Sequence, residues 1–263
     1  MKAYWTVFSA RFRLLLQYRA AALAGIATQI FWGLIRVMIF WGFYSAADGP
    51  MPMSYDEVVT YVWLGQALLL LVMFYVEQDL AAMIRDGTIA YEMVRPVNLF
   101  WFWYSRAIAG RVAPVTLRVG PVLILALLFF DMQLPASSTY AALFLISVCL
   151  SALLAASIAL AMTVSLFWTL SGDGINRIVV SASFVFSGIV IPVPLFPDWL
   201  RPLVEILPFR GLADTPYRLY LGHISMGEAG TAIAHQVIWI GGMLLFGYAM
   251  LRSGSRRLVV QGG

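Results

Sequence analysis

The segment DLAAMIRDGTIAYEMVRP, residues Asp79 to Pro96, is a charged island between two long apolar runs. Leu80, Met83 and Ile84 recur at helical spacing, and Gly87 stands where such a helix would end. Charges of both signs lie on either side of this apolar stripe. The pattern predicts a short amphipathic helix that is carried between two membrane-spanning segments and has a face of its own to bury.

The composition places the chain in a membrane. Of its 263 residues, 62% are hydrophobic and 11% are charged, whereas an ordinary soluble domain is about 25% charged. The mean hydropathy of +0.85 agrees with this assignment. We therefore predict an all-α membrane protein. Because membrane helices pack side by side, one helical bundle over residues 1–263 is the simplest organisation.

Single residue counts exclude several kinds of chemistry. Cys149 is the only cysteine, so the chain forms no internal disulfide and no cysteine-based metal site. His223 and His235 are the only histidines, which disfavours a multi-histidine centre. Lys2 is the only lysine and follows no glycine-rich loop, so the chain lacks the P-loop that binds ATP. We expect no catalytic residue, metal site or cofactor site in this chain, and no nucleic-acid partner.

Long apolar runs predict six membrane spans, each close to or above the ~20 residues that a bilayer requires. We place them near residues 21–45, 58–79, 107–130, 140–170, 175–192 and 232–251. Residues 1–20 carry an aromatic face and a basic face at helical spacing, which predicts a helix lying in the membrane interface. A basic flank without that helix is the simpler alternative.

The distribution of arginine predicts the orientation. With the N-terminus in the cytoplasm, the inner loops and termini hold most of the basic residues, and the outer side holds only Arg201, Arg210 and Arg218. Acidic residues show the reverse bias. We therefore expect both termini and the charged island on the cytoplasmic side.

Residues 193–230, on the outer side, are too apolar for an ordinary loop. Asp198 and Asp214 are placed to cap short helices. The segment is divided into short pieces by Pro197, Pro202, Pro208 and Pro216. We predict a re-entrant segment that enters the outer leaflet or covers the bundle, because irregular backbone at that depth must be buried in protein or line a cavity. An aromatic-rich external loop is the alternative.

Arg36 is the clearest charge inside a predicted span. Charges in the membrane are costly and commonly functional, so Arg36 could face a substrate or an acidic partner. A structural ion pair with Glu77, or with another subunit, is equally consistent. Glu77 and Asp79 close the second span, and we expect them to anchor the charged island. No acid lies at the centre of a span, which argues against a proton-driven carrier.

Polar and aromatic residues of the second and fifth predicted spans could line a hydrophobic substrate path together with Arg36. For each of them alone, ordinary helix packing is the simpler interpretation. The candidates are Trp63, Gln66, Met73, Phe184, Phe186 and Ser187.

Two longer motifs carry a family resemblance. One is DGTIAYEMVRPVNLFWFWYSRAIAGRVAP, Asp86 to Pro114, and the other is FPDWLRPLVEILPFRGLADTPYRLYLG, Phe196 to Gly222. Together with the interfacial N-terminal helix and the six spans, they make the chain resemble the permease subunit of bacterial ABC-2-type exporters over essentially its whole length.

The resemblance implies a partner subunit that binds and hydrolyses ATP in place of this chain. The charged island, residues 79–96, would be the coupling helix that sits in a groove of a separate ABC ATP-binding subunit, present in two copies. That subunit would bind ATP and Mg²⁺ and hydrolyse the nucleotide, and residues 1–20 would form a connecting helix that also touches it. The residues that match the coupling role are Asp79, Met83, Arg85, Asp86, Glu92 and Arg95.

The resemblance also implies two permease chains, identical or homologous, around a central path in the bacterial cytoplasmic (inner) membrane. Spans one, two and five would lie nearest the axis, and the outer segment would act as a gate. Export is the family's usual direction. The aromatic path favours a hydrophobic or amphipathic substrate, and the acidic outer loop favours a cationic, drug-like one, as in multidrug efflux.

Two other classes of function stay open. A secondary transporter or channel with no ATPase partner would need an ionisable gate, for which Arg36 is the only candidate. A membrane enzyme acting on lipids would need clustered polar residues near the interface, and the sequence shows none. The charged island separates these hypotheses, because carriers and enzymes have no evident use for a docking helix there.

Overall fold

The computed structural model describes residues 2–73, 75–169 and 172–255, and every regular element within these ranges is a helix. The long helices are α2 (Arg19–Ser45), α7 (Leu99–Phe129), α8 (Ser138–Val164, continued by η1, Ser165–Phe167) and α12 (Met226–Gly254). The shorter ones are α1 (Lys2–Leu15), α3 (Tyr55–Ala67), α4 (Leu69–Val72), α5 (Gln78–Arg85), α6 (Ile89–Met93), α9 (Asp173–Phe186), η2 (Val193–Leu195), α10 (Arg201–Ile206), η3 (Pro208–Leu212) and α11 (Asp214–Leu221).

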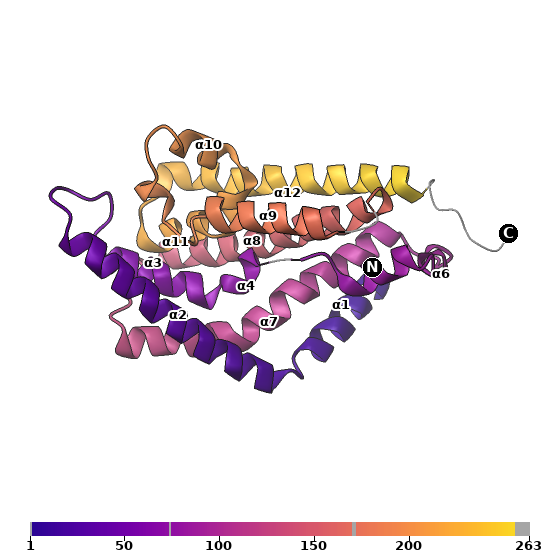
Figure 1. Ribbon diagram of the computed structural model, residues 1–263, viewed down its shortest axis with the longest axis horizontal. Coiled ribbons are helices and arrows are strands. Elements are labelled where there is room, and N and C mark those ends of the chain that lie inside the picture. The colour runs from indigo at the N-terminus through magenta and orange to yellow at the C-terminus, as the bar shows by residue number, and fades with distance from the viewer. Residues whose placement is uncertain (1, 74, 170–171, 256–263) are drawn as a thin grey trace.

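The helices form one elongated bundle with two unlike ends (Figure 1). α5 and α6 lie at one end, which we call the hairpin end, and α10 and α11 lie at the other, the loop end. α8 is the central helix, because 61% of its most apolar window is buried, against 17% for α2 and 17% for α12. The exposed sides of α2 and α12 carry large apolar side chains, as suits helices surrounded by lipid.

Within the described part of the chain, four helices are long and apolar enough to cross a membrane: α2, α7, α8 with η1, and α12. They correspond to the first, third, fourth and sixth expected spans. The expected second span, 58–79, is interrupted, since α3 and α4 are separate helices and α4 ends at Val72. The expected fifth span, 175–192, ends its helix at Phe186. The all-helical membrane architecture is confirmed, whereas helix length does not confirm six spans.

Side-chain hydrogen bonds explain why the chain can leave helical geometry after α4. We call the described residues between α4 and α5 the strap. Asn176 Oδ1 accepts a hydrogen bond from Val76 N at 3.0 Å, and Thr163 Oγ1 accepts one from Glu77 N at 3.1 Å. Non-helical backbone inside a bundle needs such partners. The apolar run that predicted an unbroken span contains no sign of them, because they come from α8 and α9.

Two long helices start earlier than expected because polar side chains cap them. The third span was expected from residue 107, but α7 begins at Leu99, where the Asn98 side chain accepts a hydrogen bond from Trp101 N at 3.4 Å. The sixth span was expected from residue 232, but α12 begins after a capping box formed by Ser225 and Glu228. Such caps satisfy amide groups that the first turn of a helix leaves unpaired.

α1 covers most of the expected interfacial segment, residues 1–20, and has two different faces. Tyr4 and Val7 pack against the apolar cluster that contains Phe100 and Trp103 of α7. Trp5 points elsewhere and is 69% exposed. One face of α1 therefore contacts protein, and the other is available to lipid.

The chain between α9 and α12 folds back onto the bundle. Residues 211–217 are all buried, and Gln236 of α12 donates a hydrogen bond to the Gly211 carbonyl at 2.7 Å. Neither predicted cap forms: α10 begins at Arg201, which pairs with Asp198 at 3.1 Å, and Asp214 is itself the first residue of α11. So much burial disfavours the alternative of a free external loop.

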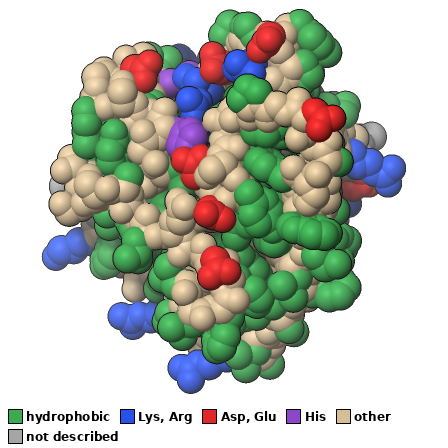
Figure 2. Space-filling view, turned by 90° about the vertical axis from the view of Figure 1, so that its left-hand side faces the viewer, with side chains coloured by type: hydrophobic (Ala, Val, Ile, Leu, Met, Phe, Trp, Pro, Cys, Tyr) green, Lys and Arg blue, Asp and Glu red, His purple; other side chains and the backbone are tan. Residues whose placement is uncertain are grey.

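Acidic side chains gather on the loop end, as Figure 2 shows for the face seen from that side. Asp56 and Glu57 lie in the first turn of α3, and Glu228 lies in the first turn of α12. Negative charge is favourable there because it complements the helix dipole. Glu57 also lies 2.8 Å from Nε2 of His223, which ties the start of α3 to the end of α11.

Candidate functional site

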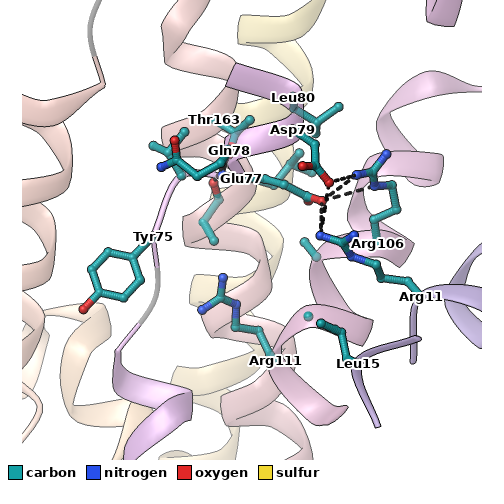
Figure 3. A pocket seen from close by; sticks show the side chains of 15 residues that line it. Arg11, Leu15, Tyr75, Glu77, Gln78, Asp79, Leu80, Arg106, Arg111 and Thr163 are labelled. Carbon is teal, nitrogen blue, oxygen red and sulfur yellow. Dashed lines mark hydrogen bonds and ion pairs between the residues drawn. The ribbon is translucent and has the colours of Figure 1, made fainter. Parts of the chain in front are cut away.

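Four charged side chains join the start of α5 to α1 and α7 (Figure 3). Glu77 Oε1 lies 2.7 Å from Arg106 Nη2 and 3.3 Å from Arg11 Nη2. Asp79 Oδ2 lies 3.2 Å from Arg106 and 3.3 Å from Arg11. We call these four residues the charge cluster. Its contacts agree with the expectation that Glu77 and Asp79 anchor the charged island.

A pocket of about 240 Å³ opens beside the charge cluster. Figure 3 shows Arg111 reaching from α7 toward the strap. Its Nη1 donates a hydrogen bond to the Met73 carbonyl at 3.2 Å, which gives the strap a third side-chain partner. Its Nε is buried without a hydrogen-bond partner. The strap is thus held by α7, α8 and α9 together.

The charged island forms a helical hairpin rather than one continuous helix. α5 ends just before Gly87, whose backbone is left-handed (φ 71°), and α6 follows. Glycine adopts this conformation without the steric penalty of other residues, so the predicted helix end at Gly87 is confirmed. Leu80 and Ile89, 1% and 0% exposed, pack with Phe100 and Trp103 and hold the hairpin on the start of α7.

The residues predicted to couple to an ATPase lie in different surroundings. Arg85, Asp86 and Arg95 are exposed on the hairpin. Glu92 is only 8% exposed and pairs with Arg95 at 2.7 Å. Met83 is half-buried in the same apolar cluster as Leu80, and Asp79 belongs to the charge cluster.

Two exposed hairpin residues were missed by the sequence analysis. Tyr91 is 78% exposed and Val94 is 81% exposed. Tyr91 lies in α6 and Val94 is its C-cap residue, and a helix this short buries only one apolar side chain, Ile89, so other apolar residues beside it are left exposed. We call Tyr91 and Val94, with the exposed Arg85, Asp86 and Arg95, the hairpin face.

Arg36 does not pair with Glu77. Its guanidinium donates a hydrogen bond to the carbonyl of Ile189, which follows α9 near the loop end. Glu77 is instead held by Arg11 and Arg106 near the hairpin end. The alternative of an Arg36–Glu77 ion pair is therefore wrong, because the two residues are bound at opposite ends of the bundle.

The other path candidates do not form one continuous surface. Trp63 and Gln66 are buried against α2, where a Cβ added to Gly33 would lie 2.6 Å from Trp63. Tight helix packing accounts for both. Ser187 is buried and its Oγ accepts a hydrogen bond from Ile189 N at 3.3 Å, so it lies beside the peptide that Arg36 binds. Phe184 and Phe186 are half-buried on α9, and Met73 begins the strap.

A second polar network holds the loop end. Asp214 is 1% exposed, and its Oδ1 accepts hydrogen bonds from the Tyr61 hydroxyl at 3.0 Å and from Val193 N at 3.3 Å. Arg218 lies 3.6 Å from its Oδ2. Burial raises the pKa of Asp214, while the positive charge of Arg218 and the hydrogen bonds oppose that shift. We call Asp214, Tyr61, Val193 and Arg218 the loop-end network.

These groups connect the hairpin to the helices around it. Among the described residues, no group of histidine, cysteine, aspartate and glutamate side chains is placed to hold a metal ion. What the geometry provides is an exposed hairpin joined by apolar contacts and ion pairs to α1, α7 and the strap. A force on the hairpin would reach the long helices through these contacts.

Comparison with protein families gives one match that extends over most of the chain. A family model described as ABC-2 family transporter protein matches residues 23–262. The match extends over nearly the full length and confirms the resemblance carried by the two motifs. No curated protein matches the chain.

Proposed function

The chain belongs to the ABC-2 transporter family, and on that basis we propose that it is the permease subunit of an ATP-driven exporter. A separate ABC ATPase, present in two copies, binds ATP and Mg²⁺ and supplies the energy. The observation that carries the proposal is the hairpin face, where Tyr91 and Val94 stand exposed beside charged residues. An exposed apolar patch with a charged rim is typical of a protein-docking surface.

In this proposal the chain crosses the membrane six times. α2, α7, α8 and α12 make four crossings, α3 with α4 makes the second in chain order, and α9 with the residues up to Pro192 makes the fifth. The hairpin end, which holds Arg11, Arg106 and Arg111, faces the cytoplasm. The acidic loop end faces outward (Figure 2). Both termini are then cytoplasmic, in the inner membrane of a bacterium.

Motion of the ATPase would reach the membrane helices through the charge cluster. Glu77 and Asp79 lie at the start of α5, whereas Arg106 belongs to α7 and Arg11 to α1. A displaced hairpin would pull on both helices and on the strap that hydrogen bonds to α8 and α9. Contacts at the hairpin face that depend on the nucleotide would therefore bias the arrangement of the bundle, as a ligand-driven change requires.

A second permease chain, identical or homologous, would complete the transporter. α2 exposes Phe31, Trp32 and Trp41, and α9 exposes Ile178 and Val185. Part of this surface would contact the second chain and the rest would contact lipid. The segment that covers the loop end would form the outer gate, and the substrate would be hydrophobic or amphipathic, within the class of drug-like molecules.

Reconstitution tests the proposal. The chain purified alone should hydrolyse no ATP, and a P-loop ATPase should co-purify with it and be identified by mass spectrometry. The reconstituted complex should move a fluorescent amphipathic dye across proteoliposome membranes only when ATP is supplied to the ATPase side. Dye movement by the chain alone on a proton gradient would refute the proposal and support a secondary transporter.

A further inference from the structure

A cavity of about 730 Å³ lies between Arg36 and the loop end. One wall is the second half of α2, with Phe40 and Phe43, and the opposite wall is the chain after α9, with Leu195 and Phe196. Sites for drug-sized molecules commonly measure about 300 to 1,000 Å³ and have mostly apolar walls. The cavity has both properties.

Three charged side chains line the cavity, and two of them neutralise each other. Arg201 and Asp198 form an ion pair at 3.1 Å, and the Asp198 side chain is 95% exposed. Arg36 donates a hydrogen bond to the Ile189 carbonyl, and no carboxylate of the described residues is ion-paired with it. A guanidinium carries several N–H donors, so Arg36 has donors left for another acceptor. The cavity therefore holds one uncompensated positive charge.

A cation beside apolar walls is unfavourable unless a partner replaces the water that it has lost. Arg36 lies on a helix long enough to cross the membrane, where ionisable residues commonly mark a substrate pathway. Guanidinium groups bind carboxylate and phosphate oxygens well, because their N–H groups match those oxygens in geometry and charge. A ligand cation in the same place would be repelled.

We infer that this cavity binds a small organic anion, with its apolar body between α2 and the chain after α9 and its carboxylate or phosphate group on Arg36. The inference rests on the proposed function, because it names the substrate class of the exporter. It reverses the charge expected from the acidic outer loop. The one acid that lines the cavity, Asp198, is exposed and already paired, whereas Arg36 is not.

Binding to the purified chain tests the inference without any ATPase. Three radiolabelled probes share one naphthyl body: naphthylacetate, naphthylmethanol and naphthylmethyl-trimethylammonium. Each is measured on the chain in phosphatidylcholine nanodiscs, and binding to empty nanodiscs is subtracted. We expect naphthylacetate to bind about tenfold more tightly than naphthylmethanol, because a hydrogen bond to a charged group contributes about that factor. The cation should bind most weakly.

Variants then assign the effect to Arg36. Arg36→Gln should weaken naphthylacetate binding about tenfold and leave naphthylmethanol binding unchanged, which also shows that the variant is folded. Arg36→Lys should keep the preference for the anion. Arg118→Gln is the matched control, since Arg118 lies on the spanning helix α7, hydrogen bonds to the Ala21 carbonyl at 3.4 Å and does not line the cavity. It should bind all three probes as the unmodified chain does.

Several outcomes would overturn the inference. Preference for the cation, or unchanged naphthylacetate binding in Arg36→Gln, would remove its basis. Displacement of the probe by added phosphatidylglycerol would assign the cavity to a lipid, and dissociation of dimers by Arg36→Gln would assign it to a second copy of the chain. Co-purification of the ATPase does not depend on any of these results, so failure of the inference and failure of the proposed exporter function are distinguishable.

Discussion

The charge cluster and the loop-end network hold non-helical chain in two different ways. In the charge cluster each acid pairs with both arginines, and the Asp79 side chain is 56% exposed. In the loop-end network a single carboxylate, Asp214, is 1% exposed and binds groups from α3, η2 and α11. The first has interchangeable pairs and touches water. In the second, a single buried carboxylate is the shared partner of every donor.

This difference indicates where the molecule can move. When the hairpin shifts, either arginine of the charge cluster can keep Glu77 or Asp79 paired, so no charge is left alone. Moving Asp214 would leave a buried carboxylate without partners, which is strongly unfavourable. We therefore expect an adjustable joint at the hairpin end and a rigid one at the loop end. Three predictions for the purified chain, and a fourth that also uses the reconstituted complex, test this contrast.

The largest effect is expected from Asp214→Ala. It should lower stability by about 3 kcal/mol, because it removes one partner from a buried, hydrogen-bonded pair. Asp214→Asn should lower stability less than Asp214→Ala does, since the amide oxygen of asparagine can still accept the hydrogen bond from the Tyr61 hydroxyl. The midpoint of thermal unfolding, followed by tryptophan fluorescence in detergent, measures both variants. An unchanged midpoint in Asp214→Ala would mean that the loop-end network is not a rigid joint.

A smaller effect is expected from Glu77→Ala, of about 1–2 kcal/mol, because Asp79 can still pair with both arginines. Asp79→Ala should lower stability less than Glu77→Ala does, since the Asp79 side chain is 56% exposed and the Glu77 side chain only 17%. A double-mutant cycle with Arg106→Ala gives the coupling energy directly. If Glu77→Ala were as damaging as Asp214→Ala, the charge cluster would be as rigid as the loop end.

Salt should separate the two networks further. At about 1 M salt the screening length falls to about 3 Å. Ions in the solvent then weaken the water-exposed pairs of the charge cluster, but they weaken the contacts of the buried Asp214 much less. The stability difference between the unmodified chain and Glu77→Ala should therefore shrink by a few tenths of a kcal/mol. The difference for Asp214→Ala should stay constant. Equal salt dependence of both variants would remove the distinction.

The smallest effect on stability is expected from Arg85→Glu, within about 0.5 kcal/mol, because Arg85 is an exposed residue of the hairpin face. ATP hydrolysis coupled to transport should nevertheless fall in the reconstituted complex. Arg252→Glu, another exposed arginine, on α12, is the matched control and should leave hydrolysis unchanged. Glu92→Lys should lower both the stability of the chain and the coupled ATP hydrolysis, since Glu92 is buried and paired with Arg95. Normal coupling in Arg85→Glu would argue against the hairpin face as the docking surface.

Several features could be predicted from residues near one another in the chain. The helix end at Gly87 follows from a local backbone conformation, and the four long helices follow from their own apolar length. The break after α4 could not be predicted, because its hydrogen-bond partners Thr163 and Asn176 are distant in sequence. The alternative of an ion pair between Arg36 and Glu77 was wrong, because the sequence shows which charged residues exist but not at which end of the bundle each of them is bound.

The sequence by itself determined that this is a helical membrane protein without a P-loop and with a charged island between apolar segments. These properties depend on composition and on short-range periodicity. Only the tertiary structure decided that Tyr91 and Val94 are exposed on the hairpin and that Glu77 binds Arg11 and Arg106. It also decided that Arg36 lines a cavity and is ion-paired with no carboxylate of the described residues. Burial and ion pairing are properties of contacts between distant segments, and those contacts exist only once the bundle has formed.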